Sequence, residues 1–201
     1  MNDICNKLLE EYNTITDKKS LHNYINFYEK FLHQFKNKPI NFLEIGLFYG
    51  DSAKLWDLYF TNSKTNIYSF DKKLKRYTKA INRYTFSERV HLNLLQHKDL
   101  IINKEEFVPI IPDHGCEEYF NTLRDTKFDI IIDDGSHYLR DQIISIQFAL
   151  NNLRKGGILI IEDTLPEHIQ ELLAFDDRLY VVDLRNNKKD VLDNILICMT
   201  I

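Results

Sequence analysis

The sequence lacks the features that mark membrane-spanning, secreted and nucleic-acid-binding proteins. No run approaches the roughly 18 apolar residues that span a bilayer, and the polar start of the chain has no signal-peptide pattern. Three widely spaced cysteines form no CxxC motif, which favours reduced thiols over disulfides. A net charge of -4 leaves no broad basic surface for nucleic acid. We therefore expect a soluble, cytoplasmic protein with a small-molecule partner, no nucleic-acid partner and no membrane association.

A dinucleotide-binding glycine motif is missing as well. The turn after the first predicted strand reads EIGLFYGDS, so the second glycine follows the first by four residues and no GxGxxG pattern forms. Glu44, Gly46 and Gly50 mark this turn, where a glycine backbone can pass close to a ligand and the amides at the helix start favour an anionic group. A purely structural turn fits this spacing equally well. The missing pattern disfavours a nicotinamide-dependent dehydrogenase.

The chain does contain a regular succession of short apolar runs and helical patterns. Its 201 residues, 44% of them hydrophobic, suffice for one sizeable core. Apolar runs predict strands at Phe42 to Gly46, Asn66 to Phe70, Val90 to Leu95, Phe128 to Ile132, Ile158 to Ile161, Arg178 to Leu184 and Asn194 to Ile201. Between the fourth and fifth runs, Gln142 to Leu153 has a helical period, and we expect Gly156-Gly157 to stop this helix. Continuous runs of this kind predict buried strands of a parallel sheet.

Acidic side chains follow two of these strands. Asp133, Asp134 and His137 come after the fourth strand, and Glu162 and Asp163 come after the fifth. Ligands collect outside the carboxyl ends of parallel strands, so we expect these side chains to face one another. A magnesium-like ion would neutralise the cluster, and His137, with an ordinary pKa of about 6.5, is a candidate general base. The alternative is that these acids are solvated loop residues or helix caps.

Two amphipathic helices are predicted ahead of the first strand, with a break near Thr16 to Ser20. We interpret residues 1–38 as a helical extension and residues 39–201 as the main domain. The aromatic face of the extension is typical of core packing. It also fits a lid over the site or the interface of a homo-oligomer.

An acid also follows the second predicted strand. Asp71 lies roughly 20 residues beyond Gly50, the offset at which an acid binds ribose hydroxyls in dinucleotide folds. Gln96 follows the third strand, where an adenine would lie. The basic run between these positions, Lys72 to Arg83, follows a helical period and is interpreted as a solvated face.

The whole pattern resembles the class I S-adenosylmethionine-dependent methyltransferases. Within that class, LEIGLFYGDS, DDGSH and IED resemble the macrocin and mycinamicin sugar O-methyltransferase family, and Asp134 precedes Glu162 by 28 residues. The resemblance implies an α/β, Rossmann-like, doubly wound sheet of seven strands, mostly parallel with the last strand antiparallel. Helices cover both faces of such a sheet.

The resemblance also implies roles for individual residues. It implies that Asp134, Glu162 and Asp163 bind magnesium and that His137 and Asp134 are catalytic. S-adenosylmethionine contacts come from Glu44, Gly46, Tyr49, Gly50, Ser52, Asp71, Gln96 and Asp133. Where many relatives carry a second histidine, this chain has Asp141.

These features predict magnesium-dependent O-methylation of a hydroxyl on a sugar, a sugar nucleotide or a similar small molecule. Two alternatives stay open at this point. One is a catechol-type or other small-molecule methyltransferase, and the other is a catalytically inactive cofactor-binding protein that works in assembly.

Overall fold

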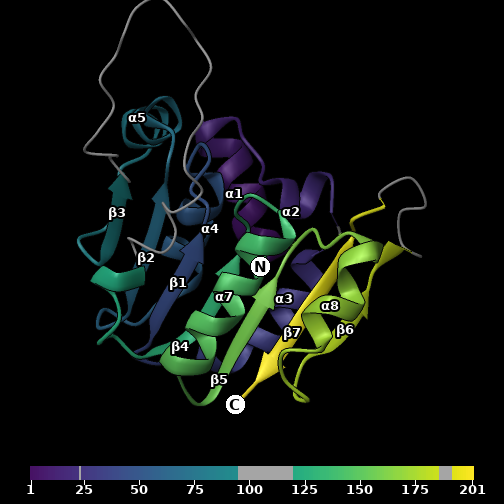
Figure 1. Cartoon of the computed structure of the whole chain (residues 1–201). Coiled ribbons are helices and arrows are strands. Elements are labelled where there is room, and N and C mark those ends of the chain that lie inside the picture. The colour runs from purple at the N-terminus through teal and green to yellow at the C-terminus, as the bar shows by residue number, and fades with distance from the viewer. Residues whose placement is uncertain (23, 95–119, 186–191) are drawn as a thin grey trace, which may run out of the picture.

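A seven-stranded sheet forms the centre of the computed structural model, which describes residues 1–22, 24–94, 120–185 and 192–201 (Figure 1). The strand order is β3-β2-β1-β4-β5-β7-β6. The strands are β1 (Asn41–Ile45), β2 (Asn66–Asp71), β3 (Val90–Leu94), β4 (Phe128–Asp133), β5 (Leu153–Ile161), β6 (Tyr180–Asp183) and β7 (Ile195–Thr200). β7 pairs antiparallel with both β5 and β6, and the other pairs are parallel. The predicted fold class is confirmed, including the antiparallel last strand.

The central strands are buried on both faces, as their continuous apolar runs predict. In β4, Ile130, Ile131 and Ile132 are fully buried. Successive side chains of a strand point to opposite faces, so Ile131 packs into one hydrophobic cluster while its two neighbours pack into the other. The sheet therefore separates two hydrophobic cores, and its polar site residues lie at the strand ends.

Helices cover both faces of the sheet (Figure 1). They are α1 (Asn2–Tyr12), α2 (Asp17–Ser20), α3 (Tyr24–Leu32), α4 (Asp51–Tyr59), α5 (Leu74–Arg83), α7 (Leu139–Asn152) and α8 (Ile169–Leu173), with 3-10 turns at His33–Phe35 and Pro166–His168. Phe148 of α7 and Leu172 of α8 belong to one core, and Tyr28 of α3 and Trp56 of α4 belong to the other. None of the helices in the described ranges is long and apolar enough to cross a membrane.

Two local predictions differ from the structure. Gly156 and Gly157 do not stop the preceding helix, because α7 already ends at Asn152 and the glycines lie within β5. The segment Thr16 to Ser20 is not only a break between helices, because it contains the short helix α2, which Thr16 caps by accepting a hydrogen bond from the backbone N–H of Lys18. The role of residues 1–38 as lid or oligomer interface stays a prediction.

Candidate active site

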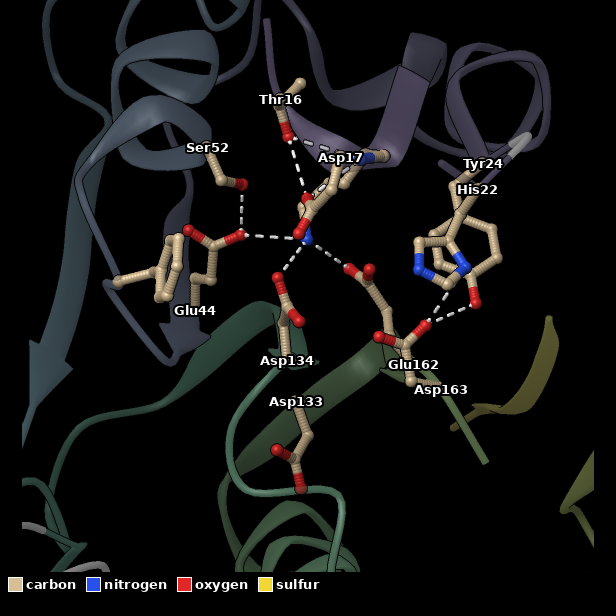
Figure 2. Close-up of polar contacts among 12 residues, drawn as sticks. Thr16, Asp17, His22, Tyr24, Glu44, Ser52, Asp133, Asp134, Glu162 and Asp163 are labelled. Atoms are coloured by element: carbon tan, nitrogen blue, oxygen red, sulfur yellow. Dashed lines mark hydrogen bonds and ion pairs between the residues drawn. The ribbon is translucent and has the colours of Figure 1, made fainter. Parts of the chain in front are cut away.

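Acidic side chains from three neighbouring strands meet at the carboxyl edge of the sheet (Figure 2). Glu44 lies in β1, Asp134 follows β4, and Glu162 and Asp163 follow β5. The backbone N–H of Glu162 donates to the carbonyl of Asp133 at 2.8 Å, which ties the ends of β4 and β5 together. The predicted meeting of the DDGSH and IED motifs at neighbouring strand ends is confirmed.

A lysine that the sequence did not point to lies at the centre of this cluster. The ammonium of Lys18 donates hydrogen bonds to Asp134 and, at 2.7 Å, to Glu162, and it lies 3.6 Å from Oε1 of Glu44. Lys18 is 0% exposed. Burial alone would lower the pKa of Lys18, but the nearby carboxylates together raise it well above its usual value. Lys18 therefore stays positively charged among the acids.

Glu162 is buried and receives two hydrogen bonds on the same oxygen. Besides the ammonium of Lys18, the hydroxyl of Tyr28 donates to Oε1 of Glu162 at 2.5 Å. Burial raises the pKa of Glu162 above its usual value, while the charge of Lys18 opposes that rise. Helix α3 thus reaches the acidic cluster through Tyr28.

Asp163 is surrounded by a phenol and two imidazoles. The hydroxyl of Tyr24 donates to its Oδ1 at 2.6 Å, Nδ1 of His22 lies 3.4 Å from the same oxygen, and Nε2 of His137 lies 3.8 Å from Oδ2. Burial, followed by the charge of Asp134, raises the pKa of Asp163, and His22 opposes the rise. Asp163 and His137 both have left-handed backbone angles, with φ of 52° and 62°.

Only part of the predicted metal-ligand set belongs to the group of side chains that lie close enough together to hold a cation. Asp134, His137 and Asp163 each offer one ligand atom, and these atoms lie within 4.8 Å of one another. Mg²⁺ prefers carboxylate oxygens and water to imidazole nitrogen, so Asp134 and Asp163 are its best-placed ligands. Oε1 of Glu162 is instead bound by Lys18 and Tyr28. The metal role of Glu162 stays a prediction.

A cavity of about 480 Å³ runs along the carboxyl ends of β1, β2 and β4. Asp71 lines one part of it, and Asp134, His137 and Asp163 line another. The carboxylate of Asp71 accepts backbone hydrogen bonds from Lys73 at 2.7 Å and Phe48 at 3.0 Å. Each of its oxygens keeps acceptor capacity for a ligand hydroxyl. The cavity is therefore of a size and chemistry that suit a nucleoside.

The two glycines of the first turn are required by close packing within the protein. Gly46 has a φ of 100°, and a Cβ at this position would overlap the carbonyl oxygen of Asp134. Gly50 has a φ of 84° and precedes α4, where a Cβ would lie 2.8 Å from the Cβ of Ala80. Gly46 also lines the cavity, whereas Gly50 is buried.

The other predicted cofactor residues around this turn divide into two groups. Glu44 lies behind the cavity, where its Oε1 accepts hydrogen bonds from Ser52 at 2.5 Å and from Trp56 at 2.8 Å. Its Oε2 is buried and has no hydrogen-bond partner among the described residues. Tyr49 and Ser52 line a smaller cavity of about 150 Å³, which shares Gly46 with the larger one.

Two further predictions concern the strand ends. Asp133, the last residue of β4, does not face the acidic cluster, since its side chain points away from those of Glu44 and Glu162 (Figure 2). Burial raises the pKa of Asp133 to about 6. Gln96 lies outside the described residues. Lys72, Lys73 and Arg76 of the basic run are exposed or partly exposed, and they also line the larger cavity.

The sequence reasoning missed the contribution of the N-terminal segment to the site. Lys18, His22, Tyr24 and Tyr28 all contact the acids that follow β4 and β5. One signal was present: the aromatic face of α3 carries tyrosines at positions four residues apart, and tyrosine brings a hydroxyl that needs a partner when buried. No local signal distinguished Lys18 from the other lysines near α2.

The fold defines a structural class. A seven-stranded sheet with one reversed strand, and a cavity across the ends of β1, β2 and β4, are the features of a class I S-adenosylmethionine-dependent methyltransferase fold. The resemblance predicted from the sequence is confirmed by comparison with known proteins. No protein-family model matches the sequence.

Individual relatives differ in how much of their length the chain spans. L-olivosyl-oleandolide 3-O-methyltransferase of Streptomyces antibioticus is 25% identical over 156 residues, 74% of this chain and 34% of that protein. MycE methyltransferase of the mycinamycin biosynthetic pathway, solved with Mg and SAH, is 24% identical with a TM-score of 0.57, covering 80% of this chain and 37% of MycE. This chain thus spans about a third of both proteins.

A smaller methyltransferase aligns over nearly its whole length. The O-methyltransferase of Bacillus cereus, solved with SAH, is 13% identical with a TM-score of 0.66, covering 100% of this chain and 92% of that one. TomG of Streptomyces achromogenes, solved with SAM, is 11% identical with a TM-score of 0.65, covering 99% of this chain and 88% of TomG. At these identities the likeness establishes the fold.

Proposed function

We propose that this chain is an S-adenosylmethionine-dependent, magnesium-dependent O-methyltransferase that acts on a hydroxyl of a sugar or sugar-like small molecule. The observation that carries this function is one cavity lined both by Asp71 and by Asp134, His137 and Asp163. The same cavity therefore contains a carboxylate that suits ribose and a cluster of side chains suited to accepting a proton and binding a cation. Two relatives support the same function, one named for 3-O-methylation of L-olivosyl-oleandolide and one solved with Mg and SAH.

The larger cavity would hold the nucleoside part of the cofactor. When bound, S-adenosylmethionine supplies a methyl group that its sulfonium has activated for transfer to oxygen. Asp71 would accept hydrogen bonds from the ribose hydroxyls. The smaller cavity, lined by Gly46, Tyr49 and Ser52, adjoins the start of α4 and would take the amino-acid end. The amides of this helix start favour a carboxylate there.

Asp134 and Asp163 would hold the magnesium ion. Both line the larger cavity. The ligand atoms of Asp134, His137 and Asp163 lie within 4.8 Å of one another. Mg²⁺ is commonly bound by one or two carboxylates together with water and substrate oxygens. When bound, it would act as a Lewis acid on an acceptor hydroxyl. The two side chains would orient that hydroxyl within reach of His137.

His137 would accept the proton of the acceptor hydroxyl. Its side chain is 37% exposed and lines the cavity, so a substrate can reach it. Oδ2 of Asp163, 3.8 Å from Nε2, is placed to stabilise the imidazolium that forms. Because a hard cation prefers oxygen ligands, the imidazole is left for proton transfer.

Binding measurements test the cofactor part of this function. Isothermal titration with S-adenosylmethionine, S-adenosylhomocysteine and NAD, each with magnesium and with EDTA, should show binding of the two sulfur ligands and none of NAD. Failure to bind either sulfur ligand would contradict the assignment of Asp71 and of both cavities.

An acceptor panel tests the reaction and its alternatives. Sugar nucleotides, free glycosides and catechols are incubated with labelled S-adenosylmethionine, with and without EDTA. Transfer to a sugar that EDTA abolishes is the expected result. Transfer to catechols instead would favour the catechol-type reading. Tight cofactor binding with no product from any acceptor would favour an inactive cofactor-binding protein.

A further inference from the structure

Lys18 has no part in the proton transfer or cofactor binding described so far, yet its position is fully determined. Its ammonium contacts two acids that follow different strands, Asp134 and Glu162, and is the only lysine nitrogen with an ion pair to either of them among the described residues. The side chain is 0% exposed. Such a buried charge is stable only because it is paired and hydrogen-bonded.

The backbone holds Lys18 in place from the other side. Its N–H donates to Oδ1 of Asp17 at 2.9 Å and to the Thr16 hydroxyl at 3.4 Å, so the first turn of α2 is capped at this residue. Asp17 itself lines both cavities. The position of Lys18 in the site is therefore fixed by contacts of both its backbone and its side chain.

The ammonium of Lys18 and a magnesium ion would compete for the same oxygens of Asp134 and Glu162. A magnesium ion bound by both Asp134 and Glu162 would lie about 2.1 Å from an oxygen of each. The Lys18 nitrogen donates to both of these side chains and lies 2.7 Å from Oε1 of Glu162. Two cations cannot share that space, and like charges repel strongly where water is excluded.

Glu162 is also held by a second donor. The Tyr28 hydroxyl donates to the same oxygen as Lys18 at 2.5 Å. Asp134 is engaged through Oδ2, and it has a second carboxylate oxygen with which to bind a cation. Asp134 can therefore serve the ammonium and a metal at once. Both donors to Glu162 use Oε1, and among the described residues no oxygen of Glu162 joins the ligand atoms of Asp134, His137 and Asp163 that lie within 4.8 Å of one another.

We propose that Lys18 is a positioning residue that keeps Glu162 out of the metal coordination shell, so that a divalent cation is held by the two carboxylates of Asp134 and Asp163. This inference rests on the metal-dependent function proposed above. It changes the role of Glu162 from metal ligand to counter-ion of a fixed ammonium. It also predicts weaker metal binding than three carboxylates would give.

Manganese binding tests this assignment without any measurement of turnover. Mn²⁺ is titrated into the full chain and followed by the electron paramagnetic resonance of the free ion. The proteins are the wild type, Glu162→Gln, Asp163→Asn, Lys18→Met and the double variant Lys18→Met/Glu162→Gln. Thermal unfolding of each protein reports whether it is folded.

We expect Asp163→Asn to weaken Mn²⁺ binding by about tenfold or more, and Glu162→Gln to change it by no more than about threefold. Lys18→Met should tighten binding by about tenfold, because it removes a like charge and frees Glu162 as a third ligand. That gain should disappear in the double variant.

Four results would overturn the assignment. They are no Mn²⁺ binding to the wild type, an equal loss in Glu162→Gln and Asp163→Asn, no gain in Lys18→Met, and a gain that persists in the double variant. If Lys18→Met does not fold, the comparison of Glu162→Gln with Asp163→Asn decides alone. Binding of S-adenosylhomocysteine to the same samples separates failure of the methyltransferase function from failure of the Lys18 assignment.

Discussion

The exposure and the fixed position of each residue in this site depend on its immediate neighbours. His137 is half-exposed on the cavity wall, and Asp163 next to it is largely buried by the phenol of Tyr24 and the ring of His22. The histidine can therefore meet a substrate while its partner stays fixed. In the function proposed above, proton transfer and cation binding would therefore fall to different side chains within a few ångströms.

His137→Ala is expected to remove the proton acceptor and leave the nucleoside pocket intact. Turnover should fall by about 10²- to 10⁴-fold, the range that general bases contribute. The affinity for S-adenosylhomocysteine, measured by isothermal titration, should stay within about twofold, because Asp71 is unchanged. Full activity of this variant would remove His137 from the mechanism.

Gly46→Ala is expected to destabilise the protein more than Gly156→Ala. Both glycines have positive φ, 100° and 80°, so both substitutions carry the backbone cost of about 1 kcal/mol or more. Only at Gly46 does the new Cβ overlap a backbone atom, the carbonyl oxygen of Asp134, while Gly156 has nothing within 4 Å. Urea unfolding of the two variants measures the difference, and equal losses would contradict the packing reason given for Gly46.

At the scale of elements, the N-terminal helices contribute to the site as well as to the core. Helix α3 packs Tyr28 against Trp56 of α4, with ring centroids 5.2 Å apart. The same Tyr28 reaches Glu162 at the end of β5. One side chain therefore joins a helix, its neighbour and the acidic edge of the sheet.

Tyr28→Phe is expected to lower the free energy of unfolding by about 1 to 3 kcal/mol, because it leaves a buried carboxylate oxygen short of one donor. Tyr59→Phe is the matched control. The Tyr59 hydroxyl is buried, and it has no hydrogen-bond partner among the described residues. Its removal should be neutral or stabilising. Chemical denaturation of both variants checks the contrast, which a similar loss in the two would contradict.

At the scale of the whole molecule, the site concentrates negative charge inside the protein. Burial raises the pKa of Glu44 to about 7, although Lys18 lowers it, and burial raises the pKa of Asp133 to about 6. Both carboxyls bind protons more readily in the folded chain than in the unfolded one. The stability they contribute is therefore fully present below their ordinary pKa and is lost as the pH rises through their folded values.

The free energy of unfolding should accordingly rise as the pH falls from about 8 to about 6, with roughly 1 kcal/mol of the gain from Glu44 alone. Thermal unfolding across this range measures the effect. Glu44→Gln should flatten the dependence, since its amide does not titrate. A melting temperature that falls between pH 8 and pH 6 would contradict the raised carboxyl pKa values.

The sequence by itself determined the sheet and the place of its chemistry. Continuous isoleucine-rich runs predict strands buried on both faces of a sheet, and acids that follow parallel strands gather at one edge. Asp134, His137 and Asp163 were found in this way because each lies within four residues of a strand end. The position of Asp71 in the cavity follows from the same rule.

Only the tertiary structure decided what shares that edge with the acids. Lys18 is 116 residues from Asp134 and 144 residues from Glu162 along the chain, so no local pattern connects them. Their contact depends on how α2 and α3 pack against the sheet, which is set by side chains such as Tyr28 and Trp56 far from either motif. The strand ends determine where the acidic side chains lie. Long-range packing determines that the ammonium of Lys18 is the cation that neutralises them.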